Sequence, residues 1–187
     1  MNRFEKSKEV YNQLFGQLPK NENDPEFMDI LRKFIFCDIF SEGNLEERTR
    51  ELITITALSV LQSLPQLKAH IGAGLNIGLL PVEIRESIYQ LAPFIGFPRT
   101  LNAISVMNEV FEQKGFKLPL QNMGTTTDDN RFEKGFAIQY PIYGDEIKNR
   151  YSDMPEVPKF LTEFGFGDFY TRKGLDIKLE SCLFWLH

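Results

Sequence analysis

The feature that most constrains the fold is a segment near the middle of the chain that begins polar and then becomes almost wholly apolar. From Leu52 to Leu61 this segment has no continuous polar face, and a helix that is apolar on every side is buried. Residues 53–56 are β-branched and would also suit a strand, but the length of the apolar run favours a helix over residues 45–62. Other elements must therefore surround this helix, and Glu51 stands where it enters the core.

Apolar residues recur at helical spacing on both sides of this segment, so we expect an all-α fold. Proline at a first helical turn and glycine after a last turn mark several boundaries, as at Pro65, Pro81, Gly16 and Gly78. The predicted helices cover residues 3–15, 26–40, 45–62, 64–77, 81–92 and 100–114.

Two further details follow from the residue types near these boundaries. Asn44 is expected to cap the buried helix, and the glycines at 72 and 74 leave room for another backbone to approach closely. The helix over residues 26–40 should face the core with one apolar stripe, formed by Phe27, Ile30, Leu31, Phe34, Ile35 and Ile39.

The last third of the chain resembles its beginning. Residues 118–130 have no periodicity and form a linker. After the linker, residues 131–134 repeat the Arg-Phe-Glu-Lys of residues 3–6, and Phe164 to Asp168 matches Phe34 to Asp38 with one small insertion between the two parts. The chain is therefore interpreted as one complete copy, residues 1–117, followed by a partial second copy, residues 131–187.

The second copy stops before any counterpart of residues 64–99. Its last predicted helix, residues 176–186, is apolar and would be costly to leave uncovered. It must cover the first copy or a neighbouring subunit, unless the sequence is a truncated product. His187 is expected to lie at the surface, because chain ends are usually poorly ordered.

Composition excludes several classes of protein. The 187 residues can bury one core, or one domain with part of a second, and 42% hydrophobic with 25% charged residues is ordinary for a globular protein. A net charge of −5 argues against nucleic-acid binding. No apolar run reaches the length of a membrane span, and the start of the chain does not resemble a signal peptide. We expect a cytoplasmic protein.

The chain is poor in residues for metal or thiol chemistry. Cys37 and Cys182 are far apart in the sequence and are expected to be free thiols. His70 and His187 are the two histidines, which is too few for a zinc site. No metal and no cofactor are therefore expected.

Several motifs occur together, in order, in the first copy. They are Arg50-Glu-Leu52, Gln66-Leu-Lys-Ala-His70, Asn76-Ile-Gly78, Pro81-Val-Glu-Ile84 and Gly96-Phe-Pro-Arg-Thr-Leu-Asn102. In these motifs the chain resembles the carboxymuconolactone decarboxylase family, whose members have the alkyl hydroperoxidase D-like helical fold. The resemblance implies a homo-oligomer, and a trimer or hexamer is favoured here.

The resemblance implies one of two chemistries. One branch of the family reduces peroxides with a Cys-x-x-Cys pair, but those positions fall on Ser63 and Gln66, which cannot form a thiolate or a disulfide. The other branch decarboxylates a carboxylated butenolide and needs no cysteine. Glu51 and His70 match the positions that both branches use as a proton relay, so the resemblance favours a lyase.

Decarboxylation requires a proton donor and groups that hold the substrate. His70 is the expected donor, and Glu51 would orient it or relay the proton. Arg99 could bind the substrate carboxylate as a fork, and Ser63 or Gln66 could add a hydrogen bond. The alternatives are that Glu51 pairs with Arg48 or Arg50, that His70 is a satisfied core histidine, and that Arg99 lies at the surface or in an interface.

Three hypotheses are therefore compatible with the sequence. The first is a cofactor-independent lyase acting on a small carboxylic acid, with Glu51 and His70 in one pocket. The second is a peroxidase, which would need Cys37 or Cys182 close to His70. The third is a non-catalytic assembly or ligand-binding module, which a sealed His70 without a cavity would support.

Overall fold

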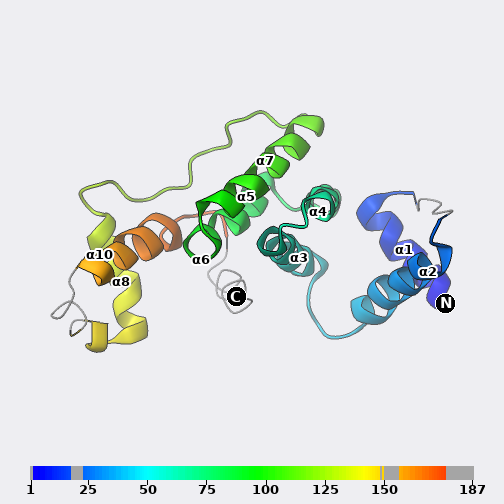
Figure 1. The fold of residues 1–187 in the computed structure, drawn as a ribbon, viewed down its shortest axis with the longest axis horizontal. Helices are drawn as coiled ribbons and strands as arrows, with labels where there is room; N and C mark the ends of the chain where they lie inside the picture. Colours follow the sequence, from blue (N-terminus) through cyan, green and yellow to red (C-terminus); the bar gives the residue numbers. More distant parts are fainter. Residues whose placement is uncertain (1, 18–22, 148, 150–155, 176–187) are drawn as a thin grey trace.

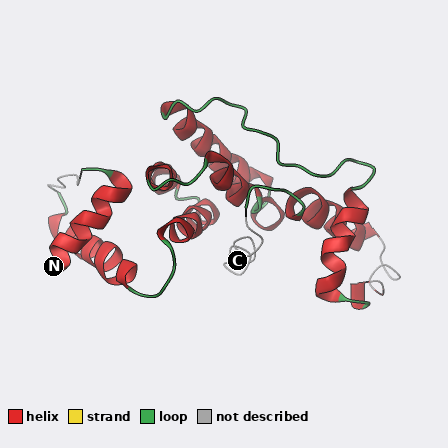
Figure 2. Cartoon of the chain, turned by 180° about the vertical axis from the view of Figure 1, so that it is seen from behind, coloured by secondary structure: helices red, strands yellow, loops and turns green. Residues whose placement is uncertain are grey.

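The computed structural model describes residues 2–17, 23–147, 149 and 156–175, and every regular element in these ranges is a helix. Figure 2 shows these helices joined by loops, with no strand among them. The prediction of an all-α fold is therefore confirmed. None of the described helices combines the length and apolarity needed to cross a membrane.

The helices form three groups along the molecule (Figure 1). The first is an N-terminal unit, made of α1 (Arg3–Phe15), α2 (Pro25–Lys33) and the π-helix η1 (Phe34–Ile39). The middle bundle contains α3 (Glu47–Leu61), α4 (Leu64–Asn76), α5 (Pro81–Tyr89), α6 (Ala92–Ile95) and α7 (Phe97–Gln113). A C-terminal unit follows, made of α8 (Arg131–Tyr143), α10 (Glu156–Phe160) and the π-helix η2 (Leu161–Tyr170).

The core lies in the middle bundle, around the helix that the sequence predicts to be buried. Ile55 of α3, Leu67 and Ile71 of α4, and Phe111 of α7 have no exposed surface. The whole cluster comprises Leu52, Ile55, Leu67, Ile71, Leu79, Ile84, Ile88, Ala103, Met107, Val110 and Phe111. Burying these side chains is the main stabilising contribution to the bundle, and it fixes α3 against α4.

The helix predicted over residues 26–40 differs from the expectation in two ways. It continues beyond Lys33 as a π-helix, and the stripe predicted to face the core is exposed, with Phe27 at 65%, Ile30 at 66% and Phe34 at 54%. The wider π-turn changes which residues share a face, so that Phe36 and Cys37 are the buried residues of η1. The core-facing prediction for this stripe is wrong for the single chain, except for Leu31, which is partly buried and packs against the cluster of Leu14, Phe36 and Ala73.

Helix boundaries differ from the predictions by a few residues in places. The residue that caps α3 is Glu46 rather than Asn44, and its side chain makes no capping hydrogen bond. A short helix, α6, separates α5 from α7 where one boundary at Pro93 was expected. Helix α7 begins at Phe97 instead of residue 100, because Pro98 suits a first helical turn.

The N-terminal and C-terminal units each contain an ion pair between their first helix and their π-helix. Arg3 pairs with Asp38 in the first, and Arg131 pairs with Asp168 in the second. The Arg3 guanidinium lowers the pKa of Asp38, whereas burial raises the pKa of Asp168. The duplication itself stays a prediction, and the helix predicted over residues 176–186 lies outside the described residues, as do Cys182 and His187.

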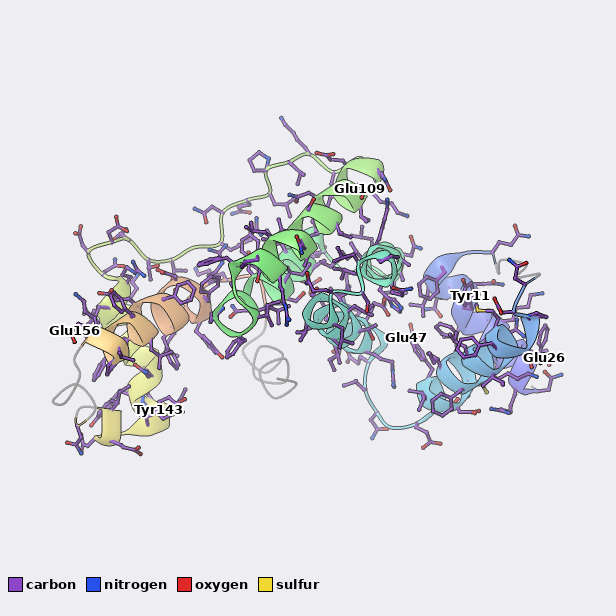
Figure 3. All side chains as sticks on the ribbon, in the orientation of Figure 1. Tyr11, Glu26, Glu47, Glu109, Tyr143 and Glu156 are labelled. Carbon is purple, nitrogen blue, oxygen red and sulfur yellow. The ribbon has the colours of Figure 1, made fainter. Side chains whose placement is uncertain are left out.

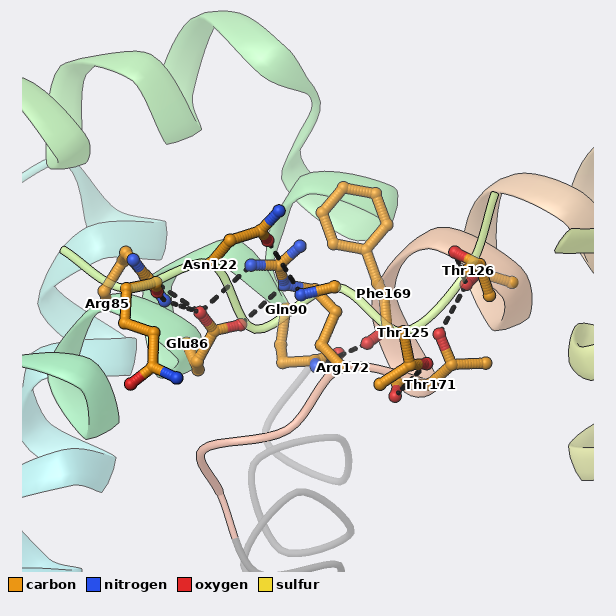
Figure 4. Close-up of polar contacts among 12 residues, drawn as sticks. Arg85, Glu86, Gln90, Asn122, Thr125, Thr126, Phe169, Thr171 and Arg172 are labelled. Carbon is orange, nitrogen blue, oxygen red and sulfur yellow. Dashed lines mark hydrogen bonds and ion pairs between the residues drawn. The ribbon is translucent and has the colours of Figure 1, made fainter. Parts of the chain in front are cut away.

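A buried ionic cluster attaches the C-terminal unit to α5 (Figure 4). Glu86 is 1% exposed and accepts hydrogen bonds from Arg85 Nε at 2.8 Å and from Arg172 Nε at 2.6 Å. Both guanidinium groups lie over the ring of Tyr89, at 5.5 and 5.2 Å from its centroid. Gln90 Nε2 also donates to the carbonyl oxygen of Phe169 at 3.0 Å. A buried charge with two cationic partners is costly to separate, so this contact fixes residues 169–172 on the bundle.

Candidate functional site

The structure brings together Glu51 of α3 and His70 of α4. The distance between Glu51 Oε1 and His70 Nδ1 is 2.6 Å. The side chain of Glu51 is 2% exposed and that of His70 is 22% exposed. Thus the carboxylate is covered by protein, while the imidazole still reaches the surface.

This contact depends on the close approach of α3 and α4, which is the largest helix pairing within the bundle. A tight turn joins the two helices, with Gln62 at a φ of 57°. Gly74, one turn after His70, also has a local role: a Cβ at this position would lie 2.8 Å from Leu79 Cδ1 and 3.6 Å from Glu51 Cγ. Glycine therefore lets the Leu79 side chain pack beside the carboxylate. The expectation that Gly72 and Gly74 admit another backbone is wrong, since the neighbours of Gly74 are side chains and a Cβ at Gly72 would meet nothing within 4 Å.

The carboxylate determines which nitrogen of His70 is available for chemistry. An ionised carboxylate only accepts hydrogen bonds, so Nδ1 must carry the proton that it donates to Glu51. Nε2 is then the free nitrogen, and it has no hydrogen-bond partner among the described residues. A buried carboxylate in this position fixes the tautomer and the orientation of the imidazole.

Arg48 and Arg50 do not pair with Glu51. Arg48 bonds the carboxylate of Glu83 and the carbonyl oxygen of Gly78. Arg50 donates to the carbonyl oxygens of residues 39 and 42, at 3.3 Å each. The alternative in which one of these arginines is the partner of Glu51 is therefore wrong.

The N-terminal unit covers one side of His70. The ring of Phe15, the last residue of α1, meets the imidazole edge to face, with 5.1 Å between centroids. Tyr11 and Phe36 pack against Phe15 at 5.0 and 5.7 Å, and burial raises the pKa of Tyr11. Sequence reasoning missed Phe15 as a site residue. Its position before Gly16 marks a helix end, but nothing in that pattern shows which helix the ring will contact.

The other predicted site residues lie farther from the pair. Gln66 precedes His70 by one turn of α4 and is exposed, while Ser63 is half-buried at the turn before α4. Arg99 is exposed, and its carbonyl oxygen accepts a hydrogen bond from Gln62. Because α3 rises about 1.5 Å per residue, Arg99 lies near the end of α3 opposite to Glu51. The structure brings Glu51 and His70 together, and it does not bring Arg99 to them within one chain.

Metal and thiol groups offer no further chemistry in the described part of the chain. Its His, Cys, Asp and Glu side chains form no group of three that could hold a metal ion. Cys37 is buried in η1, next to Asp38 in the sequence. The contact between Glu51 and His70 is therefore the candidate site.

Replacing Glu51 with glutamine is expected to mix the two tautomers of neutral His70. The glutamine amide can accept from Nδ1–H through its oxygen or donate to Nδ1 through its nitrogen, so one tautomer is no longer enforced. We expect nitrogen NMR of the imidazole to report a single Nδ1–H form in the wild type and both forms in Glu51→Gln. An unchanged tautomer in the variant would contradict this role of the carboxylate.

Comparisons with known proteins identify one matching family model and two relatives. Residues 25–109 match the model of the carboxymuconolactone decarboxylase family. The 4-carboxymuconolactone decarboxylase of Acinetobacter baylyi is 26% identical over 120 residues, covering 60% of this chain and 90% of that protein. A Paracoccus denitrificans protein, described as an uncharacterized 15.0 kDa protein in the nqo9-nqo10 intergenic region, is 32% identical over 81 residues, covering 42% of this chain and 60% of that protein. Glu51 and His70 lie inside the matched segment, and Phe15 lies outside it.

Proposed function

Because residues 25–109 of this chain match the model of the carboxymuconolactone decarboxylase family, we propose that the protein is a cofactor-independent lyase. Its substrate is a small carboxylated lactone, and Glu51 with His70 forms its proton relay. The observation that carries this proposal is the 2.6 Å contact between the buried Glu51 carboxylate and His70 Nδ1. That contact leaves Nε2 of a partly exposed imidazole free to face a ligand.

The chemistry needs no electron carrier when the carboxylate is attached next to an unsaturated lactone. The bond to the carboxylate breaks, carbon dioxide leaves, and the electron pair enters the conjugated lactone as a dienolate. A proton must then be added to the ring. General acid catalysis of such a step contributes about 10²- to 10⁴-fold to the rate.

In this scheme His70 supplies the proton from Nε2, and it recovers a proton from solvent after the product leaves. Glu51 stays ionised and accepts the Nδ1 hydrogen bond throughout. The imidazolium that starts the cycle is therefore paired with a buried opposite charge. Glu51 orients the donor, and His70 transfers the proton.

The thiol chemistry of the other branch of the family is not favoured here. Ser63 and Gln66 stand at the two cysteine positions, and neither can form a disulfide or a sulfenic acid. The thiol of Cys37 is buried beside Asp38. Alkylation of accessible thiols should therefore leave turnover unchanged.

The proposal is tested by incubating the purified full chain with γ-carboxymuconolactone. We expect carbon dioxide and the enol-lactone product in equal amounts, with one solvent deuteron on the product ring in D₂O, because the donated proton exchanges with solvent. A rate no higher than that without protein would contradict the proposal and favour a non-catalytic, ligand-binding member of the family. Peroxide consumption that alkylation abolishes would favour the redox alternative.

A further inference from the structure

The segment that matches the family begins at residue 25, yet the ring closest to the imidazole comes from α1 (Figure 3 labels Tyr11 on this helix). We propose that α1 is part of the ligand site, with Phe15 as a positioning and specificity residue. Phe15 holds the His70 ring and selects ligands that carry a flat, unsaturated ring beside their carboxylate. This inference rests on the proposed function for the identity of the ligand, but its first test does not require turnover.

The end of α1 is held in place by polar contacts with two helices of the bundle. Asn76 Nδ2 of α4 donates to the carbonyl oxygen of Leu14 at 2.8 Å, and Lys114 Nζ bonds Asn76 Oδ1 at 3.1 Å. Gln13 Nε2 donates to Glu47 Oε2 of α3 at 2.8 Å. These contacts fix the last turn of α1 relative to α3 and α4. The backbone of Phe15 therefore has little freedom to move away from His70.

The geometry of the two rings suits a positioning role. Their planes cross at 88°, which is the favourable edge-to-face arrangement for a ring pair. Glu51 fixes one nitrogen of the imidazole, and Phe15 fixes the plane of the ring. Together they define the direction in which Nε2 can transfer a proton.

The phenyl ring of Phe15 also offers an aromatic surface to the ligand. Phe15 and His70 are each only partly covered by the protein, and their ring centroids are 5.1 Å apart, so a ligand bound at the exposed imidazole would lie within reach of the phenyl ring. A flat conjugated ring stacks on or against a phenyl ring, whereas a puckered saturated ring touches fewer of its atoms. The aromatic wall therefore favours the unsaturated ligand.

The first test compares two small acids that differ in the shape of the ring. Titration with 2-furoate and with tetrahydrofuran-2-carboxylate is followed through the imidazole resonances of His70, in a His187→Gln background that leaves one histidine in the chain. We expect the wild-type site to bind the flat acid about three- to tenfold more tightly, the scale of one aromatic pair. Phe15→Leu should remove this preference, and Phe15→Tyr should restore it.

Tyr11→Leu is the matched control, because Tyr11 packs on Phe15 and Phe36 in the same cluster. It removes an aromatic ring from α1 while leaving the Phe15–His70 contact in place, and it should retain the preference for 2-furoate. Equal loss in Phe15→Leu and Tyr11→Leu would overturn the inference, since only general loosening of α1 would explain it. Absence of any preference in the wild type would also overturn it.

A second measurement separates this inference from the proposed lyase activity. With γ-carboxymuconolactone, Phe15→Leu should raise KM and lower kcat about three- to tenfold each, because both binding and proton delivery use the ring. A wild-type protein that prefers 2-furoate but releases no carbon dioxide would overturn the lyase proposal and support Phe15 as a ligand-selecting residue. Turnover that Phe15→Leu leaves unchanged would overturn the inference and leave the lyase proposal intact.

Discussion

His70→Gln is expected to lower kcat for decarboxylation of γ-carboxymuconolactone by about 10²- to 10⁴-fold, the usual contribution of a general acid. The glutamine amide can still donate a hydrogen bond to Glu51, so the buried carboxylate keeps a partner. It cannot carry a transferable proton at neutral pH. The measurement is the initial rate of carbon dioxide release at saturating substrate, together with a thermal unfolding curve that shows the variant to be folded.

The control for this prediction is His187→Gln, which removes the other histidine and should leave kcat unchanged. Because Glu51 acts through His70, the double variant Glu51→Gln/His70→Gln should be no slower than His70→Gln alone. A loss of less than tenfold in His70→Gln, with folding intact, would show that His70 is not the proton donor. The lyase proposal would then lose its chemical basis.

Gly167→Ala is expected to disrupt the C-terminal unit, with a cost of 1 to 3 kcal/mol or more, about the range for overpacking a tight contact. A Cβ at this position would overlap the backbone carbonyl oxygen of Arg131 on α8. Gly135 lies at the same crossing, where a Cβ would overlap the carbonyl oxygen of Thr162. Since these are backbone atoms, the two helices could accept a methyl group only by moving apart. Hydrogen exchange of the α8 amides, compared between variant and wild type, measures the effect.

Gly165→Ala provides the matched control for this prediction. It lies in the same π-helix, and its Cβ would meet only the end of the Leu161 side chain, at 3.4 Å. In Gly165→Ala, hydrogen exchange of the α8 amides should be as slow as in the wild type. If Gly167→Ala and Gly165→Ala behaved alike, the close crossing of α8 and η2 would not be needed for the stability of this unit.

Much of the bundle could be predicted from local patterns. The apolar residues of α3, with Pro65 and Gly78 around α4, give two consecutive helices joined by a short turn. Such helices must pack antiparallel, and an antiparallel pair brings a residue near the start of one close to a residue in the second half of the other. The contact between Glu51 and His70 follows from that geometry. The family resemblance added the reason to select these two residues.

Other features depend on contacts that no local pattern encodes. The burial of Phe36 and Cys37 in place of Phe34 and Ile35 accompanies the π-turns after Lys33, which no local pattern predicts. The contact of Phe15 with His70 joins residues that are distant in the sequence, and a phenylalanine at a helix end can pack in many ways. The partner of Glu86, Arg172, is also far along the chain, so the ionic cluster could not be predicted from either segment.

The Glu86 cluster has a consequence for where this protein can be divided. Arg172 donates to Glu86 from beyond the linker, and without it the carboxylate would keep Arg85 as its ionic neighbour on α5. A shortened chain that ends at the linker would also lose one of the two guanidinium groups that now lie over the ring of Tyr89, that of Arg172. The family-matched portion and residues 169–172 are therefore joined by a buried ionic contact and by the hydrogen bond of Gln90 to Phe169. A protein made of the family-matched portion alone would therefore have a different surface on α5.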